Sequence, residues 1–229
     1  MRVVRCLVGL LFLTVGRAQP PAALPGPVPL SAVVDAPFTD LRWQTRRLAD
    51  LGAQRATVLF FATIECPLVR RYLPRIGALA KDYQERGVVV LVVSVGAGDS
   101  LVDAAGQAAN VAPAAVFGKD FDLSLARACG VDRTATAVVL DRDHRLVYRG
   151  RVDDQHAYTG ARSQPSRNDL LLAVDDVLAD RAVAVAETTV SGCLITAPAA
   201  VIDATAPTFA RDIAPILQRH CQECHRPGG

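Results

Sequence analysis

The sequence has very little lysine, and its basic residues never form a long run. Lys81 and Lys119 are the only lysines among 25 basic residues, and neighbouring arginines occur at most in pairs. The formal net charge is only +2. Proteins that bind a polyanion usually carry a clustered excess of positive charge. The composition therefore argues against nucleic-acid binding, and we expect no nucleic-acid partner.

The longest apolar run near the N-terminus is too short to span a bilayer stably. Two arginines precede this run, which covers residues 6–15, and the small-x-small triplet Gly16-Arg17-Ala18 follows it. This pattern is typical of a secretory signal peptide at residues 1–18, with a retained N-terminal anchor as the alternative. We therefore expect a periplasmic or secreted protein. In such a compartment cysteines pair, carry a cofactor or perform redox chemistry.

Composition divides the rest of the chain into one domain of ordinary size and shorter flanking segments. Proline enrichment at residues 19–29 predicts a tether. Residues 30–181 hold the strand and helix patterns of one α/β domain, and the overall hydrophobic content of 51% is ample for its core. Small residues and threonines at 182–207 indicate a linker. Residues 208–229 form a separate C-terminal segment.

The centre of the domain is predicted to be a strand, helix, strand crossover. The apolar runs Val58–Ala62 and Val88–Val95 read as strands buried on both faces. Between them, Pro67 is well placed to start a helix that should run to about Arg86. Cys66 then lies at the carboxyl edge of the first strand, which is where open α/β sheets place their sites.

The remaining elements of the domain are weaker predictions. We expect a strand at 39–43, helices at 100–110 and 121–129, and two short antiparallel strands at 135–140 and 145–149. Ser166 with Asp169 resembles a capping box, which predicts a last helix from there to about Ala179.

Cys66 is the first candidate for chemistry. A thiol at the first turn of a helix faces unpaired backbone N–H groups and the positive end of the helix dipole, which favour the thiolate. The neighbouring Glu65 opposes this effect, whereas Arg70, Arg71 or Arg75 would reinforce it if one of them turned back toward the helix start. The alternative is an ordinary buried cysteine.

Several features around Cys66 resemble the thioredoxin-like superfamily. A strand is followed by Cys66-Pro67, and Pro74 lies eight positions after the cysteine. The resemblance implies a three-layer α/β/α domain with a mixed central sheet. Val69 stands where a thioredoxin has its second cysteine. Thr63, three residues before Cys66, is instead similar to the peroxidatic motif of the peroxiredoxin, or AhpC/TSA, branch, in which the hydroxyl orients a peroxide.

Two further positions depart from these families. Leu59 replaces a proline that the peroxiredoxin branch usually carries, and Ala135 stands where the superfamily usually has a cis-proline facing the catalytic cysteine. Since a cis bond without proline is costly, we expect a trans peptide there. The resemblance therefore implies a redoxin-type domain without fixing its subtype.

The C-terminal segment carries a second cofactor signal. Cys221, Cys224 and His225 form C-x-x-C-H, the attachment pattern of c-type haem. Two thiols one helical turn apart reach the two vinyl groups, and the adjacent imidazole ligates the iron. The alternatives are a chance match or half of a zinc site. Together with Asp212–Leu217, this motif resembles the start of a c-type cytochrome module and predicts a short helical cytochrome segment that binds heme c.

The cytochrome module that the motif implies is incomplete in this sequence. Four residues follow His225, and the only methionine, which would be the usual sixth ligand, is Met1. The haem would then be five-coordinate or completed by a partner, or the chain is truncated and further C-terminal domains are missing. We favour truncation.

The expected function combines the two signals. Cys66 would attack a peroxide or disulfide substrate, Cys193 in the linker would resolve the product, and Arg133 could stabilise a thiolate or peroxide. Cys129 is expected to be buried. The hypothesis is an exported thiol-based oxidoreductase coupled to heme c, with an electron donor or acceptor protein as partner. The alternatives are a structural Cys66–Cys193 staple, and an electron-transfer or assembly module whose thioredoxin-like domain is a non-catalytic scaffold.

Overall fold

The computed structural model describes residues 28–52, 54–111, 113–196 and 207–221. The expected signal peptide lies outside the described residues, as do Cys224 and His225. Among the helices that are described, none has the length and apolar character needed to cross a membrane.

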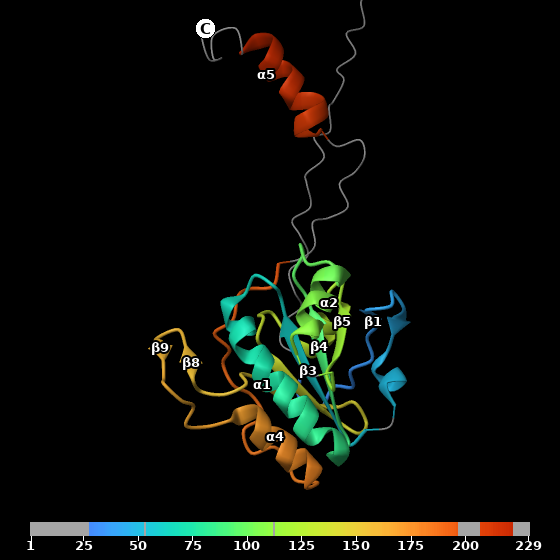
Figure 1. Cartoon of the computed structure of the whole chain (residues 1–229), viewed down its shortest axis with the longest axis vertical. Coiled ribbons are helices and arrows are strands. Elements are labelled where there is room, and N and C mark those ends of the chain that lie inside the picture. Colours follow the sequence, from blue (N-terminus) through green and yellow to red (C-terminus); the bar gives the residue numbers. More distant parts are fainter. Residues whose placement is uncertain (1–27, 53, 112, 197–206, 222–229) are drawn as a thin grey trace, which may run out of the picture.

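A mixed sheet forms the centre of the domain (Figure 1). Within the described residues it has seven strands in the order β2-β1-β5-β4-β3-β6-β7. The neighbours β3, β4 and β5 are parallel, and the remaining pairs are antiparallel. The strands are β1 Phe38–Asp40, β2 Thr45–Arg46, β3 Ala56–Ala62, β4 Val88–Ser94, β5 Val116–Lys119, β6 Ala137–Asp141 and β7 Leu146–Gly150.

Helices cover both faces of this sheet, so the three-layer prediction is confirmed. Helices α1 (Pro67–Tyr83) and α4 (Asp169–Leu178) lie side by side on one face (Figure 1). Helix α3 (Ser124–Cys129) packs on the other face with the N-terminal segment. Helix α2 (Leu101–Ala109) packs beside β5. The short turns η1 (Leu48–Leu51) and η2 (Gln84–Arg86) follow β2 and α1.

Strand β3 shows why an uninterrupted apolar run folds as a central strand. Val58 and Phe60 point into the core under α1 and α4, whereas Leu59 and Phe61 point into the core on the opposite face. All four side chains are fully buried. Burial of each such side chain contributes about 1.5–3 kcal/mol, which makes β3 a rigid base for the residues that follow it.

Helix α4 differs from its prediction at its start. The helix begins at Asp169 with Asn168 as its N-cap, so the capping box at Ser166 is wrong. The Ser166 backbone N–H and hydroxyl both bind the carboxylate of Asp154, with the N–H at 2.8 Å. This long-range partner competes successfully with the local cap. The hairpin of β8 (His156–Ala157) and β9 (Gly160–Ala161) was also not predicted.

The segment after α4 follows the body of the domain. Bridges join Glu187 to Arg149 in β7 and Leu194 to Arg133 before β6. Val190 and Ile195 are buried. This path brings the end of the segment to the edge of the sheet where β3 ends and α1 begins.

The last described residues form a separate helical stretch. Phe209–Ile213 (η3) continues into α5, Ala214–His220. The Thr208 hydroxyl accepts a hydrogen bond from the N–H of Arg211 at 3.2 Å and caps the stretch. A helix is therefore present where the sequence predicts one.

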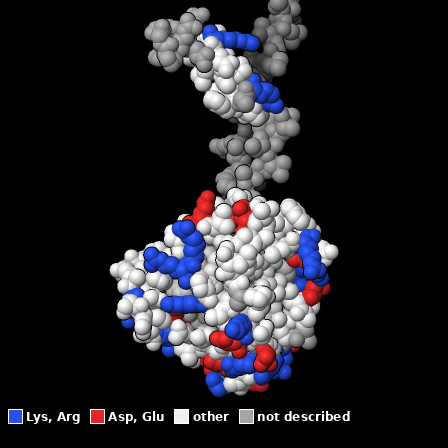
Figure 2. All heavy atoms as spheres, viewed as in Figure 1, with Lys and Arg blue, Asp and Glu red and all other residues white. Residues whose placement is uncertain are grey.

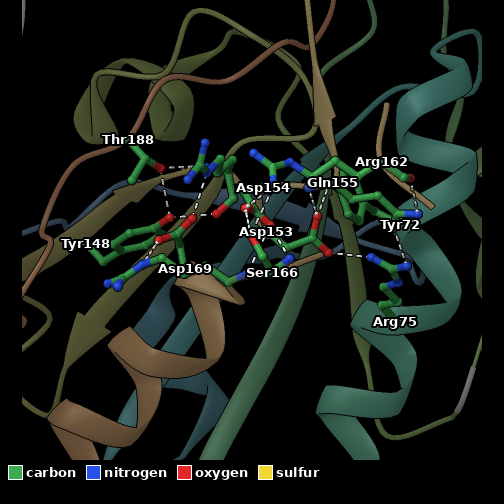
Figure 3. A network of polar contacts seen from close by, with 12 residues as sticks. Tyr72, Arg75, Tyr148, Asp153, Asp154, Gln155, Arg162, Ser166, Asp169 and Thr188 are labelled. Carbon is green, nitrogen blue, oxygen red and sulfur yellow. Dashed lines mark hydrogen bonds and ion pairs between the residues drawn. The ribbon is translucent and has the colours of Figure 1, made fainter. Parts of the chain in front are cut away.

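A polar network crosses the end of the sheet from Tyr148 and Thr188 to Tyr72 and Arg75 in α1 (Figure 3). Its centre is Asp153, which is 0% exposed. Asp153 accepts a hydrogen bond from the Tyr72 hydroxyl at 2.6 Å and one from Arg75. Burial and this carboxylate raise the pKa of Tyr72. The network therefore links α1 to the segment that follows β7 through hydrogen bonds and an ion pair.

Replacement of Asp153 by alanine should lower the free energy of unfolding by about 3 kcal/mol, because the Tyr72 hydroxyl and the Arg75 guanidinium would lose their buried partner. Urea denaturation measures this change. Asp143→Ala is the matched control, since Asp143 is exposed in the turn between β6 and β7, and it should change stability by less than about 0.5 kcal/mol. Equal effects of both substitutions would contradict the role of Asp153.

Candidate active site

The structure brings Cys66 and Cys193 together although 127 positions separate them. Their Sγ atoms are 3.2 Å apart, and the Cys193 thiol donates to the Cys66 sulfur. Cys66 is the N-cap of α1 and only 1% exposed, whereas Cys193 is exposed. Both thiols are free. A movement of roughly 1 Å would bring the sulfurs to the length of a disulfide bond, about 2.05 Å.

The loop before β6 holds Cys193 in this place. The N–H of Thr134 donates to the carbonyl of Cys193 at 2.9 Å, and the N–H of Cys193 donates to the Thr134 hydroxyl at 3.2 Å. Two residues later, the N–H of Ile195 donates to the carbonyl of Asp132 at 2.8 Å. The Cys193 segment thus pairs with residues 132–134 like a short strand.

Gly192 makes this close pairing possible. A Cβ atom at this position would lie 1.7 Å from the carbonyl oxygen of Thr134. Real Cβ contacts do not come this close, so no larger residue fits without displacement of the loop. Nothing in the sequence indicated that a glycine of the predicted linker would have this role.

Arg133 lies next to the Cys193 side of the pair. Its guanidinium donates to the carbonyl of Gly192 at 3.1 Å and lies 5.7 Å from the centre of the Tyr158 ring. Tyr158 comes from the turn between β8 and β9, and its hydroxyl donates to the same carbonyl at 3.3 Å. The positive charge of Arg133 acts on Cys193, where it favours the thiolate.

The two thiols have opposite pKa shifts. Burial raises the pKa of Cys66, but hydrogen bonds from the Thr134 hydroxyl, the Val69 N–H and Cys193 outweigh it, so the pKa is lowered overall. The pKa of Cys193 is raised, first because its thiol hydrogen-bonds Cys66 and then because of burial. At intermediate pH, the proton of the pair therefore stays on Cys193 and the negative charge on Cys66.

Substitution Thr134→Val should raise the pKa of Cys66, because it removes the hydroxyl that favours the thiolate. The pH at which alkylation of Cys66 reaches half its maximum rate should then move upward, as read from the mass of the peptide 56–70. The control Thr45→Val changes an exposed residue of the edge strand β2. An unchanged pH profile in Thr134→Val would show that the hydroxyl does not act on Cys66.

Thr63 does not lie as its expected role, orienting a peroxide at Cys66, would require. Its hydroxyl donates to Asp99 Oδ1 at 3.1 Å, and the Ser94 hydroxyl donates to Asp99 Oδ2 at 2.9 Å. Asp99 is buried. The N–H of Cys66 donates to the carbonyl of Thr63 at 3.4 Å. Thr63 therefore connects the β3–α1 turn to the β4–α2 loop beneath Cys66.

Ala135 occupies the position of the superfamily's cis-proline with a left-handed backbone. Among the described residues every peptide bond is trans, and Ala135 has φ of 59°. Its N–H donates to the carbonyl of Phe61 at 2.7 Å. This turn places Thr134 where its backbone and hydroxyl contact Cys193 and its hydroxyl also contacts Cys66.

The surface near Cys66 carries basic side chains and a cleft. Arg70, Arg71 and Arg75 are exposed on α1, and basic side chains gather over this end of the helix in Figure 2. Arg75 is engaged with Asp153. A cleft of about 500 Å³ runs between α1 and α2, with Ile64, Arg70 and Val102 among its lining residues. Ile64 is two residues before Cys66, so the cleft lies close to the start of α1.

The other cysteines lie apart from this pair. Cys129 is fully buried, and burial raises its pKa. Cys221 is exposed at the end of α5, while Cys224 and His225 lie outside the described residues. The haem-attachment prediction therefore rests on the sequence motif.

Comparison with known families identifies the domain. The family model for Redoxin matches residues 32–164, which is more than half of the chain. The chain belongs to the Redoxin family. Among curated proteins, no relative matches it.

Solved structures share the thioredoxin-like fold of this Redoxin chain. A hypothetical protein from Sinorhizobium meliloti is 25% identical with a TM-score of 0.67, covering 76% of this chain and 97% of its own. A putative thiol:disulfide interchange protein DsbE from Chlorobium tepidum is 19% identical with a TM-score of 0.52, covering 67% and 99%. A putative thioredoxin from Neisseria meningitidis is 18% identical with a TM-score of 0.52, covering 66% and 93%. These likenesses confirm the thioredoxin-like part of the fold prediction.

Proposed function

We propose that this Redoxin chain is a thiol–disulfide oxidoreductase whose redox pair is Cys66 and Cys193. The observation that carries the proposal is the 3.2 Å separation of their sulfur atoms at the start of α1. In the reduced state the pair holds two thiols, and in the oxidised state one disulfide. Conversion of the dithiol to the disulfide transfers two electrons and releases two protons, which a partner disulfide takes up as it becomes two thiols.

Two placements favour disulfide exchange over peroxide reduction. The Thr63 hydroxyl donates to Asp99, so its proton is not directed at a peroxide on Cys66. Arg133 lies beside the Cys193 loop. This guanidinium donates to the carbonyl of Gly192, so that N–H is not directed at a peroxide bound to Cys66. A disulfide or dithiol partner needs neither group.

Mapping of the disulfide tests this function directly. The full chain is oxidised in a glutathione buffer, alkylated, and digested with trypsin, which cuts after the arginines that bound peptides 56–70 and 182–211. We expect these two peptides to be joined by a disulfide that reduced glutathione opens reversibly. If Cys66 and Cys193 never pair and Cys66 resists exchange, the domain is a non-catalytic binding scaffold.

We also propose that the protein is exported and that it binds heme c covalently. The pattern of residues 1–18 supports export to the periplasm or secretion, where disulfide chemistry and the attachment of c-type haem both take place. The C-x-x-C-H motif supports thioether bonds to Cys221 and Cys224 with His225 as an iron ligand. The haem would supply one-electron transfer to or from a donor or acceptor protein.

Denaturation of the protein tests whether haem is attached covalently. Expression with export in a host that matures c-type cytochromes should give a chain whose haem remains bound after denaturation. The double substitution Cys221→Ala and Cys224→Ala should remove this covalent haem, whereas Cys129→Ala should keep it. Loss of the haem from the unsubstituted chain on denaturation would rule out the thioether bonds.

A further inference from the structure

The thiol pair is asymmetric in its access to solvent. Cys66 Sγ lies under the Cys193 segment, and Cys66 belongs to the buried core between the sheet and α1. Cys193 is exposed, and its neighbour Leu194 is 62% exposed. Thiol–disulfide exchange needs an incoming thiolate to reach the sulfur that it attacks. In the Cys66–Cys193 disulfide, only Cys193 offers such an approach.

We infer that Cys193, and not Cys66, is the sulfur that forms the mixed disulfide with the partner. This inference rests on the proposed function and reverses the usual order, in which the cysteine at the helix start meets the substrate. Cys66 then acts inside the protein, as leaving group in one direction and as resolving thiolate in the other.

The chemistry balances in both directions. A partner thiolate attacks Cys193 Sγ; the bond from the partner sulfur to Cys193 forms while the Cys66–Cys193 bond breaks, and Cys66 leaves as a thiolate. A second partner thiolate then attacks the partner sulfur of the mixed disulfide; the partner's own disulfide forms, the bond to Cys193 breaks, and Cys193 leaves as a thiolate that takes up a proton. The partner loses two electrons, which the Cys66–Cys193 pair gains. In reverse, Cys193 attacks a partner disulfide while its proton passes to Cys66 Sγ, 3.2 Å away, and one partner sulfur leaves as a thiolate. Cys66 gives this proton to the departing thiolate and attacks Cys193 Sγ; the Cys66–Cys193 bond forms, the bond to the partner breaks, and the second partner sulfur leaves as a thiolate.

The surroundings of Cys66 suit a leaving group. A thiol of lower pKa leaves faster in exchange, and hydrogen bonds from Thr134 and Val69 lower the pKa of Cys66 against the effect of burial. The pKa of Cys193 is raised, because its hydrogen bond to Cys66 and burial outweigh the opposite effects of Thr134 and Arg133. Displacement of Cys66 from Cys193 is therefore favoured over the opposite displacement.

The hydrogen bonds of the Cys193 segment point to the same assignment. Direct attack on Cys66 would need this segment to move away. That movement breaks the bonds between Thr134 and Cys193 and the bond between Ile195 and Asp132. Attack on Cys193 leaves these bonds in place.

Exchange with glutathione tests the inference on the unsubstituted full chain. The oxidised chain is mixed briefly with reduced glutathione, quenched in acid, alkylated with N-ethylmaleimide and digested with trypsin. Cys66, Cys129 and Cys193 then lie on the separate peptides 56–70, 128–133 and 182–211. We expect glutathione on Cys193 and maleimide on Cys66 in at least tenfold excess over the opposite arrangement, with Cys129 carrying maleimide only.

The outcomes separate the two proposals. Glutathione mainly on Cys66, or equally on both cysteines, would overturn the assignment of Cys193 and leave the thiol–disulfide function standing. Absence of the Cys66–Cys193 disulfide before glutathione is added would overturn the proposed function itself, and the inference with it.

Discussion

Substitution Cys66→Ser should lower the rate at which the chain oxidises a dithiol peptide in a glutathione buffer by about 100-fold or more. The disulfide that acts on the peptide needs both sulfurs, and a serine at position 66 leaves Cys193 as an isolated exposed thiol. Cys193→Ser should cause a loss of similar size, because residues that act as a unit are not additive. A fluorescent dithiol peptide reports the rate directly.

Cys129→Ser is the matched control for this experiment. Cys129 is fully buried in α3, and burial raises its pKa. Its replacement should leave the rate of peptide oxidation within about twofold of the original, since a buried thiol of raised pKa takes no part in exchange. Full activity in Cys66→Ser, or a large loss in Cys129→Ser, would refute the assignment of the redox pair.

Local patterns in the sequence were sufficient to predict the core of the fold. The β-branched run that became β4 and the apolar run that became β3 leave few alternatives to buried parallel strands. Pro67 and the helical periodicity after it likewise predict α1. The position of Cys66 at the carboxyl edge of β3 follows from these local signals, so this part of the site can be predicted from the sequence alone.

The rest of the site depends on contacts between distant segments, which local patterns do not report. The sequence predicts Cys193 as a resolving thiol that lies in a linker. The structure instead brings it to Cys66 by pairing its backbone with Thr134. Neither Thr134 nor Gly192 carries a sequence signal for this role. Thr63 shows the opposite case, since a motif suggested a peroxide contact whereas its hydroxyl donates to Asp99.

The placement of Cys193 explains how the domain accommodates the lack of a second cysteine in α1. Val69 occupies that position and is buried. The second sulfur arrives instead from the C-terminal side of the domain and packs against the loop around Ala135, where the superfamily usually has its cis-proline. The left-handed turn at Ala135 and the pairing of Cys193 with Thr134 therefore form one local arrangement at the start of α1.

Substitution Gly192→Ala provides the strongest test of this arrangement. The added Cβ would lie 1.7 Å from the carbonyl oxygen of Thr134, so the segment must shift by more than 1 Å to relieve the contact. The sulfurs would then no longer be held at 3.2 Å. A shift of this size lowers the effective concentration of one thiol at the other, and this concentration sets how readily the disulfide closes. We expect the equilibrium constant for the Cys66–Cys193 disulfide to fall by 10- to 100-fold, on the order of a 30–60 mV rise in reduction potential.

Equilibration with glutathione buffers of graded potential measures this constant. Gly98→Ala is the matched control, because a Cβ atom there meets nothing within 4 Å, and the potential should stay unchanged. Both variants should show the same cooperative unfolding of the domain, since Gly192 lies in a peripheral segment and not in the sheet. An unchanged potential in Gly192→Ala would mean that the Cys193 segment is free to find Cys66 without its pairing to Thr134. Because that pairing holds Cys193 within reach of Cys66, a lowered equilibrium constant in Gly192→Ala with an intact fold would identify residues 192–195 as a built part of the redox site.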